Sequence, residues 1–180
     1  MSQVKLTTAR ALVALAILAS LLSVVKFNHC ANTGWATPDQ YVHACYSDLP
    51  ALFEARGLST NQWPFASDDN SVEYPVITAM VMYVTSFAAN SPVGYFNINI
   101  FFLILLFIAT VLIVRKIRPE FAYLVPVAPA MIASLFINWD LWAIATMMLA
   151  IYRFDRKQFL YSALLLGVSI STKFLPIFLL

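Results

Sequence analysis

The chain has 180 residues, of which 61% are hydrophobic and only 11% are charged, with a formal net charge of +2. Soluble domains carry about 25% charged residues, and a single core in a chain of this length does not hide so much apolar surface. The composition therefore excludes an ordinary soluble domain and predicts an integral membrane protein. The basic residues are not interleaved with aromatic residues in a patch, which excludes nucleic acid as a partner.

The first predicted element is a transmembrane helix over about residues 8–27, which contains the run ALVALAILASLLSVV. This apolar run, which begins at Ala11, follows the basic residues Lys5 and Arg10. A cleaved signal peptide would end in small residues, and the flank Val24-Val25-Lys26-Phe27 does not supply them. Because a span needs roughly 20 residues, we expect an uncleaved membrane helix.

Residues 28–93 are predicted to form a large first loop, which holds most of the acids and both cysteines. Arg56 is its only basic residue. If the loop lies outside the cytoplasm, Cys30 and Cys45 can form a disulfide; two unpaired thiols are the alternative. Its acids are Asp39, Asp48, Glu54, Asp68, Asp69 and Glu73.

The apolar run 74–89 inside this loop allows two topologies. As a span, it would place the basic clusters at 115–118 and 153–157 outside the cell, against the positive-inside tendency. As a helix lying in the membrane interface, it leaves every basic cluster in the cytoplasm. We choose the interfacial helix, because the run is short for a span and is bounded by Pro75 and by the turn at 90–92.

Four further transmembrane helices are predicted, at about 94–114, 120–137, 139–154 and 159–180. Each is apolar nearly all round, as membrane helices are. Pro126 and Pro129 interrupt the second of them, and such prolines are tolerated where neighbours satisfy the freed carbonyls. The result is an all-α, multi-pass protein of the cell membrane with a cytoplasmic N-terminus. Because the last run ends without a cap, we expect more helices to follow it.

Two loop residues are candidates for chemistry. Asp48 can act as a general base on a hydroxyl at the membrane surface, or it can simply cap a helix. Arg56 can hold a phosphate in a bidentate contact, or it can form a surface ion pair with Asp48 or Glu54. The spacing of Asp48, Leu52 and Arg56 would put all three on one helical face.

The other candidates flank apolar segments. Glu73 is either a site acid or a helix N-terminal acid, and Tyr74 is either a site residue or an interface anchor. The turn Asn138-Trp139-Asp140 holds an acid between two hydrophobic helices, which is costly unless the acid faces water or a partner. The alternative is a polar interhelical turn with Trp139 and Trp142 as interface aromatics. Lys173 lies deep in an apolar run and either binds a lipid phosphate or snorkels to the headgroups. The spacing of the two histidines predicts no metal site.

Four segments carry a family resemblance: CYSDLPALFEARGL (45–58), EYPVITAMVMYV (73–84), NWDLWAIA (138–145) and STKFLPIFLL (171–180). In this order, the chain resembles the integral membrane glycosyltransferases of family 87, which depend on polyprenyl phosphate mannose and have the GT-C fold. The motifs are short, and their ordered set is the specific feature. The resemblance covers almost the whole chain after the first helix.

The resemblance implies a GT-C-like helix bundle whose first extracytoplasmic loop carries interfacial helices. It implies a hexosyltransferase, with mannose favoured, that moves the sugar from a polyprenyl-phosphate donor to a glycan or glycolipid acceptor of the cell envelope. Asp48 matches the catalytic aspartate of the family. Arg56 and Lys173 are our candidates for the phosphate by chemistry, and the resemblance makes four further residues line the site: Glu73, Tyr74, Asn138 and Asp140. We expect no cofactor and no metal. The family has roughly twice as many helices as this chain, so we expect a fragment or one half of a split protein.

Two other functions remain open on the sequence alone. A small-molecule transporter would need polar residues along a path through the helices, and Asn97, Asn99 and Lys173 are its candidates. No inverted repeat accompanies them. A non-catalytic or truncated membrane scaffold is the other alternative, which the abrupt apolar end of the chain favours.

Overall fold

The computed structural model describes residues 8–66 and 71–179, so Lys5, Asp68 and Asp69 lie outside the described residues. Every regular element in these two ranges is helical, in agreement with the predicted all-α class. The elements are α1 Ala9–Thr33, α2 Asp39–Val42, α3 Asp48–Ala55, the 3₁₀ turn η1 Leu58–Thr60, α4 Val76–Ser86, α5 Pro92–Ile117, α6 Leu124–Val127, α7 Pro129–Ser134, α8 Asp140–Asp155, α9 Phe159–Thr172 and η2 Leu175–Leu179.

α1 and α5 are the two helices that are long and apolar enough to cross a membrane, judged by length and composition among the described residues. They contain 25 and 26 residues. At about 1.5 Å of rise per residue, each is longer than the roughly 30 Å hydrocarbon core of a bilayer. Thr8 caps the start of α1, where its hydroxyl accepts a hydrogen bond from the amide of Ala11, and Ser91 caps α5 in the same way. α5 ends at the basic cluster before Pro119, a residue that disfavours helix in its predecessor.

α4 is too short to cross a bilayer. Its 11 residues extend for about 16 Å, roughly half of the hydrocarbon thickness. Pro75 precedes its first residue, and the helix ends before the turn at 90–92. α4 is thus shorter than the run 74–89, and its placement in the membrane interface stays a prediction.

The continuous helix expected over 120–137 is instead two short helices, α6 and α7. Ala128 separates them with an extended backbone (φ −67°, ψ 121°), because Pro129 follows it and disfavours the helical conformation. The break frees backbone carbonyls from helical hydrogen bonds. At the other end of α7, Lys26 of α1 donates from Nζ to the Ala133 oxygen over 2.5 Å and so satisfies a carbonyl in the last turn of that helix.

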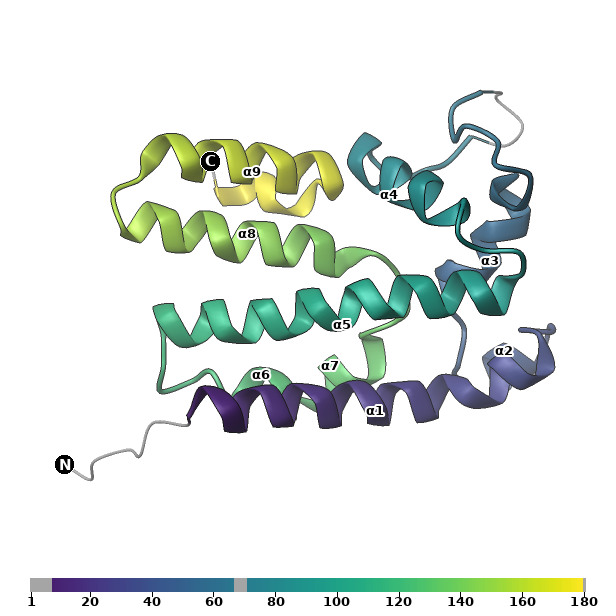
Figure 1. The fold of residues 1–180 in the computed structure, drawn as a ribbon, viewed down its shortest axis with the longest axis horizontal. Coiled ribbons are helices and arrows are strands. Elements are labelled where there is room, and N and C mark those ends of the chain that lie inside the picture. The colour runs from purple at the N-terminus through teal and green to yellow at the C-terminus, as the bar shows by residue number, and fades with distance from the viewer. Residues whose placement is uncertain (1–7, 67–70, 180) are drawn as a thin grey trace.

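α8 and α9 form an antiparallel pair (Figure 1). Ser162 and Ser169 of α9 donate their hydroxyls to the carbonyl oxygens of Ala150 and Ala143 in α8, at 2.9 and 2.7 Å. The two serines are seven residues apart in α9, and the two alanines are seven residues apart in α8. Both bonds therefore lie on one face of each helix. Small residues and hydroxyls are typical of close helix contacts in membranes. The last expected helix, 159–180, ends at Thr172, and Lys173 is extended.

The molecule has two chemically different ends. Figure 1 places the start of α1, the end of α5 and the α8–α9 turn at one end, and α2, α3 and α4 at the other. The basic clusters at 115–118 and 153–157 therefore lie at the first end. The described part of the acidic loop 28–93 lies at the second.

Candidate functional site

Asp48 is the first residue of α3, and Ser47 is the residue that caps this helix. The Ser47 hydroxyl accepts a hydrogen bond from the amide of Leu49 over 3.2 Å. The same hydroxyl donates to the carbonyl of Phe136, and the Asp48 amide donates to that of Ile137 over 2.7 Å. The alternative of Asp48 as the cap is therefore wrong, and its carboxylate is free for other contacts.

Two phenols hold the Asp48 carboxylate. Tyr46 donates its hydroxyl to Oδ1 over 2.7 Å, and Tyr74 donates to Oδ2 over 2.5 Å. Burial, and then the hydrogen bond to Asp48, raise the pKa of Tyr46 to about 12. The same two causes also raise the pKa of Tyr74. Both phenols therefore remain protonated donors at neutral pH.

Lys173 and Asp140 form an ion pair beside these phenols. Lys173 Nζ lies 2.8 Å from Asp140 Oδ1 and 5.2 Å from the centroid of the Tyr74 ring. Asp140 Oδ1 is shielded from solvent and makes no aligned hydrogen bond, so the contact is an ion pair without hydrogen-bond geometry. Asn138 fixes the start of α8 by accepting from the Asp140 amide over 3.0 Å, which is a local turn contact typical of asparagine.

Arg56 is paired with Glu73, not with Asp48 or Glu54. α3 ends at Ala55, and Arg56 is its C-cap with φ −116°, so the expected face through Asp48 and Arg56 does not continue that far. The Arg56 side chain is 23% exposed and that of Glu73 is 66% exposed. The pair ties the end of α3 to the residue that precedes Tyr74.

An open pocket of about 410 Å³ lies next to this cluster. Glu73, Tyr74 and Lys173 supply its polar lining, and Pro75, Phe174 and Leu175 supply the apolar part. Asn138 and Asp140 line a smaller neighbouring pocket of about 150 Å³. The structure thus brings Asp48, Tyr74, Asp140 and Lys173 together, and it leaves Arg56 at the rim through its contact with Glu73.

An apolar groove of about 510 Å³ runs between α4, α5 and α8. Ile77, Met80 and Val84 of α4 face Phe102 of α5 and Trp142 of α8 across it. α4 is attached to the end of α9 by Thr78, whose hydroxyl donates to the Thr172 carbonyl over 2.6 Å. Because Thr172 precedes Lys173, the groove and the polar pocket share this attachment.

The sequence did not predict the buried hydrogen-bonded pair of Trp139 and Asn99 next to the site. Trp139 is 1% exposed, and the edge-to-face contact between its ring and that of Tyr74 has centroids 5.7 Å apart. Its Nε1 donates to Asn99 Oδ1 over 2.7 Å, and Asn99 donates to the Tyr95 carbonyl. Asn99 is therefore a partner of Trp139 in the core, and the candidate role of Asn99 in a transport path loses its support. The position of Trp139 between Asn138 and Asp140 was the available signal.

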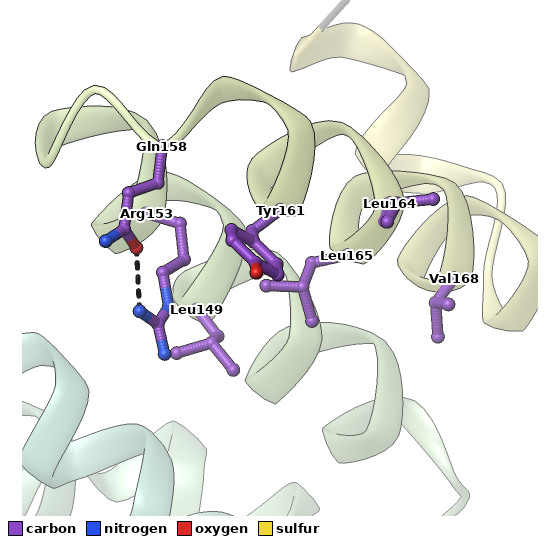
Figure 2. A pocket seen from close by; sticks show the side chains of 7 residues that line it. All are labelled: Leu149, Arg153, Gln158, Tyr161, Leu164, Leu165 and Val168. Atoms are coloured by element: carbon purple, nitrogen blue, oxygen red, sulfur yellow. Dashed lines mark hydrogen bonds between the residues drawn. The ribbon is translucent and has the colours of Figure 1, made fainter.

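A pocket of about 640 Å³ lies at the other end of the molecule, between α8 and α9 near their connecting turn. Figure 2 shows Arg153 and Gln158 facing each other above Leu149, and their side chains are joined by a 2.7 Å hydrogen bond. Among the residues that the structure describes, no acid lines this pocket. It contains none of the residues predicted for the site, so we do not assign chemistry to it.

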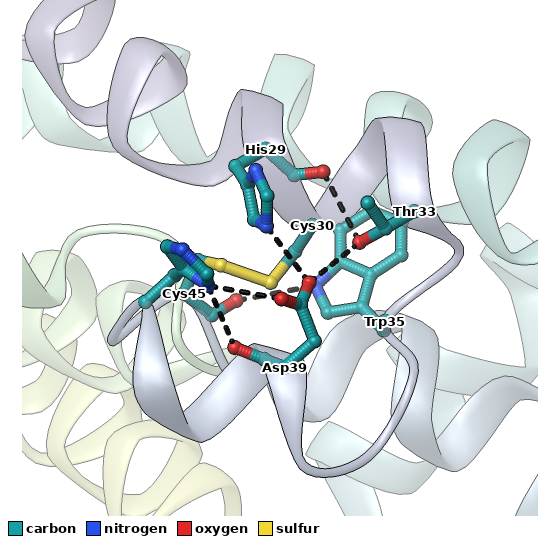
Figure 3. A network of polar contacts seen from close by, with 7 residues as sticks. His29, Cys30, Thr33, Trp35, Asp39 and Cys45 are labelled. Atoms are coloured by element: carbon teal, nitrogen blue, oxygen red, sulfur yellow. Dashed lines mark hydrogen bonds and ion pairs between the residues drawn. A yellow bond between two sulfur atoms is a disulfide. The ribbon is translucent and has the colours of Figure 1, made fainter.

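Metal-ligating side chains meet near the end of α1. His29, Asp39 and His43 lie close together there, next to a disulfide between Cys30 and Cys45. Figure 3 shows His29 and Asp39 facing each other beside the disulfide. The expectation that the histidines form no metal site therefore overlooked this geometry, because the sequence spacing alone does not bring the two rings together.

The chain matches no protein-family model, no curated protein and no solved structure.

Proposed function

We propose that the protein is a multi-pass glycosyltransferase of the cell membrane. It moves a hexose, with mannose favoured by the motif resemblance, from a polyprenyl phosphate to a glycan or glycolipid acceptor of the cell envelope. The observation that carries this proposal is the convergence of Asp48, Tyr74, Asp140 and Lys173 beside one open pocket. A carboxylate base and a cation for a phosphate are the two groups that such a transfer needs.

The distribution of charge supports the orientation. Loops on the cytoplasmic side carry an excess of Lys and Arg, and the clusters at 115–118 and 153–157 share one end of the molecule. In the proposed topology this end is cytoplasmic, with the N-terminus. Asp48 and Lys173 then face the outer side, where lipid-linked sugars and envelope acceptors meet.

Asp48 is the proposed base. A carboxylate has about four lone-pair sites, and Tyr46 and Tyr74 occupy two of them. A remaining site accepts the proton of the acceptor hydroxyl as its oxygen attacks the anomeric carbon. The bond between that carbon and the phosphate oxygen breaks, the electron pair stays on the phosphate, and the configuration at the carbon inverts. The proton remains on Asp48 and polyprenyl phosphate leaves.

Lys173 is the proposed partner of the leaving phosphate. A cation placed where negative charge develops lowers the barrier to transfer. In the structure Asp140 holds Lys173 at the pocket, and the donor phosphate takes the place of Asp140 as its counter-ion. Arg56 is engaged by Glu73, so we now give Arg56 the role of positioning the pocket rim.

The apolar groove fits the lipid part of the donor. Apart from Thr85, its lining residues are aliphatic or aromatic, which suits a polyprenyl chain. α4 begins directly after Tyr74 and Pro75, which line the polar pocket. A lipid phosphate at Lys173 can therefore extend its chain along α4.

The test is transfer by the purified protein in proteoliposomes that contain polyprenyl phosphate mannose and an envelope glycolipid. We expect Asp48→Asn to lower the transfer rate by about 10²–10⁴-fold, the range for a lost general base, while donor binding is retained. Asp155→Asn removes an acid at the opposite end and serves as the matched control. Wild-type transfer rates in the Asp48→Asn protein would show that Asp48 is not the base.

A further inference from the structure

The end of α1 and the short α2 bring three metal-ligating side chains together. His29 Nε2 lies 2.8 Å from Asp39 Oδ2, and His43 Nδ1 lies 3.0 Å from Asp39 Oδ1. The three ligand atoms all lie within 4.8 Å of one another, and the two imidazole centroids are 4.0 Å apart. The sequence contains two histidines, so both of them are at this one carboxylate.

These distances suit a tetrahedral ion. With metal–ligand bonds of about 2.0–2.1 Å, neighbouring ligand atoms in a tetrahedron are about 3.4 Å apart. The two imidazole nitrogens lie 2.8 and 3.0 Å from different oxygens of the Asp39 carboxylate, and one ligand atom from each residue lies within 4.8 Å of the others, so the required spacing is within reach. Small side-chain rotations are enough to place the three atoms on one ion, and a fourth position stays open to water.

The ligand types select the kind of metal. Two imidazole nitrogens and one carboxylate oxygen suit Zn²⁺ and similar transition metals. Ca²⁺ and Mg²⁺ require oxygen ligands, in larger number. The side chains are 44%, 31% and 49% exposed for His29, Asp39 and His43, so an ion can enter from solvent.

The surrounding contacts hold the ligands in place. Cys30 follows His29 directly, and its disulfide to Cys45 fixes the two ends of the loop that carries Asp39 and His43. Thr33 donates its hydroxyl to Asp39 Oδ2 over 3.0 Å, the kind of outer contact that orients a metal-bound carboxylate. Figure 3 shows Thr33, Asp39 and the disulfide on the same side of the α1 end.

We propose that His29, Asp39 and His43 bind one Zn²⁺-class ion, which clamps α2 to the end of α1. Side-chain contacts also connect α2 to the proposed base Asp48. Tyr41 of α2 stacks on Tyr46 with centroids 5.6 Å apart, and Tyr46 donates to Asp48. The metal site is nevertheless separate from the transfer chemistry, so the two proposals can fail independently.

The experiment measures Zn²⁺ binding to the full chain in detergent micelles or nanodiscs, after chelator treatment, by isothermal titration calorimetry. We expect one ion per chain, and a rise in the thermal midpoint with Zn²⁺ because an ion that binds only the folded state stabilises it. Co²⁺ in place of Zn²⁺ should give the intense visible absorption of a four-coordinate site. Mg²⁺ should produce neither effect.

The variants His29→Gln, Asp39→Asn and His43→Gln should each weaken Zn²⁺ binding by at least about 100-fold, since loss of even an outer contact costs about 10–100-fold. Asp155→Asn is the control acid and should bind as the wild type does. Circular dichroism and the thermal midpoint without metal check that each variant is folded. Unchanged binding in a His29→Gln/His43→Gln double variant, or a wild-type protein that binds no Zn²⁺ in stoichiometric amount, overturns the proposal.

Discussion

Lys173 and Asp140 join the end of α9 to the start of α8 through an ion pair of 2.8 Å. The pair closes the open end of the helical hairpin, opposite the turn at 156–158. The two side chains are 38% and 42% exposed, and exposed ion pairs contribute only about 0–1 kcal/mol. An incoming phosphate that replaces Asp140 at Lys173 would therefore give up little ion-pair energy, although it would leave the solvent-shielded Oδ1 of Asp140 without its partner.

Replacement of Lys173 by methionine should weaken the binding of polyprenyl phosphate by about 10–100-fold. This range corresponds to the roughly 1.5–3 kcal/mol of a hydrogen bond to a charged group. Lys173→Arg should retain most of the affinity, because the charge stays. Binding to protein in nanodiscs measures the effect, with Lys157→Met at the opposite end as the control. Equal affinity in Lys173→Met and in the wild type would remove Lys173 from the proposed site.

Removal of the phenol hydroxyls should slow transfer without changing donor binding. Tyr74→Phe keeps the ring beside Lys173 and Trp139 but deletes the bond to Asp48, and Tyr46→Phe deletes the other bond. Each change should lower the transfer rate by about 10–100-fold, since a bond to a carboxylate contributes about 1.5–3 kcal/mol. Tyr41→Phe is the control. A double variant with the wild-type rate would contradict the positioning role.

Alkaline pH should destabilise the fold through the same phenols. The pKa of Tyr46 is raised from 10.0 to about 12, so the folded state holds this proton more tightly than the unfolded chain. Its contribution is fully present below pH 10 and is lost as the pH rises through about 12. Thermal midpoints across that range measure the loss, which Tyr46→Phe should reduce. A spectroscopic titration of the tyrosines that gives Tyr46 a pKa near 10.0 would contradict the burial of Tyr46 at Asp48.

Loss of the disulfide should destabilise the end of the molecule that holds α2 and α3. Cys30 and Cys45 are separated by 15 residues, and closing a loop of that length contributes about 3 kcal/mol. A Cys30→Ser/Cys45→Ser protein should unfold at a lower temperature and bind Zn²⁺ more weakly. Treating the wild type with a reductant should reproduce both effects. If stability and affinity are unchanged, the disulfide does not organise the metal ligands.

Labelling of single cysteines in intact cells tests the topology. In a background with Cys30 and Cys45 replaced, an impermeant thiol reagent should label Val42→Cys, which replaces a side chain that is 74% exposed, and Asp140→Cys. It should not label Lys116→Cys or Asp155→Cys. Labelling at 42 and 116 but not at 140 would mean that α4 crosses the membrane. Asp48 and Asp140 would then lie on opposite sides, and the shared site would be excluded.

The sequence predicted the helices whose ends carry local signals. Pro75 precedes α4 as expected. The turn at 90–92 was expected to end the preceding run, and in the structure Ser91 caps α5 and Pro92 lies in its first turn, two residues before the expected start at 94. The family resemblance implied that Asp48 and Asp140 share a site, and the structure brings both to the same cluster through Tyr74 and Lys173.

The features that the sequence did not predict depend on contacts between distant residues. Whether Pro126 and Pro129 kink a helix or break it depends on tertiary contacts, and here the bond from Lys26 to the Ala133 carbonyl holds α7 against α1. The choice of Glu73 as the partner of Arg56 depends on the path of the loop between them. His29 and His43 meet only because the chain reverses after α1 and is tied by Cys30 and Cys45.

The hydrogen bond from Thr78 to the Thr172 carbonyl couples the position of α4 to that of Lys173. An occupant of the apolar groove that displaces α4 therefore also displaces the Thr172 backbone next to Lys173. By thermodynamic linkage, anything that restrains the ammonium must in turn change how readily the groove accepts an occupant. We therefore expect the affinity of Lys173 for the phosphate headgroup to depend on the length of the attached lipid chain. Short-chain analogues should discriminate less between a phosphate and an uncharged headgroup.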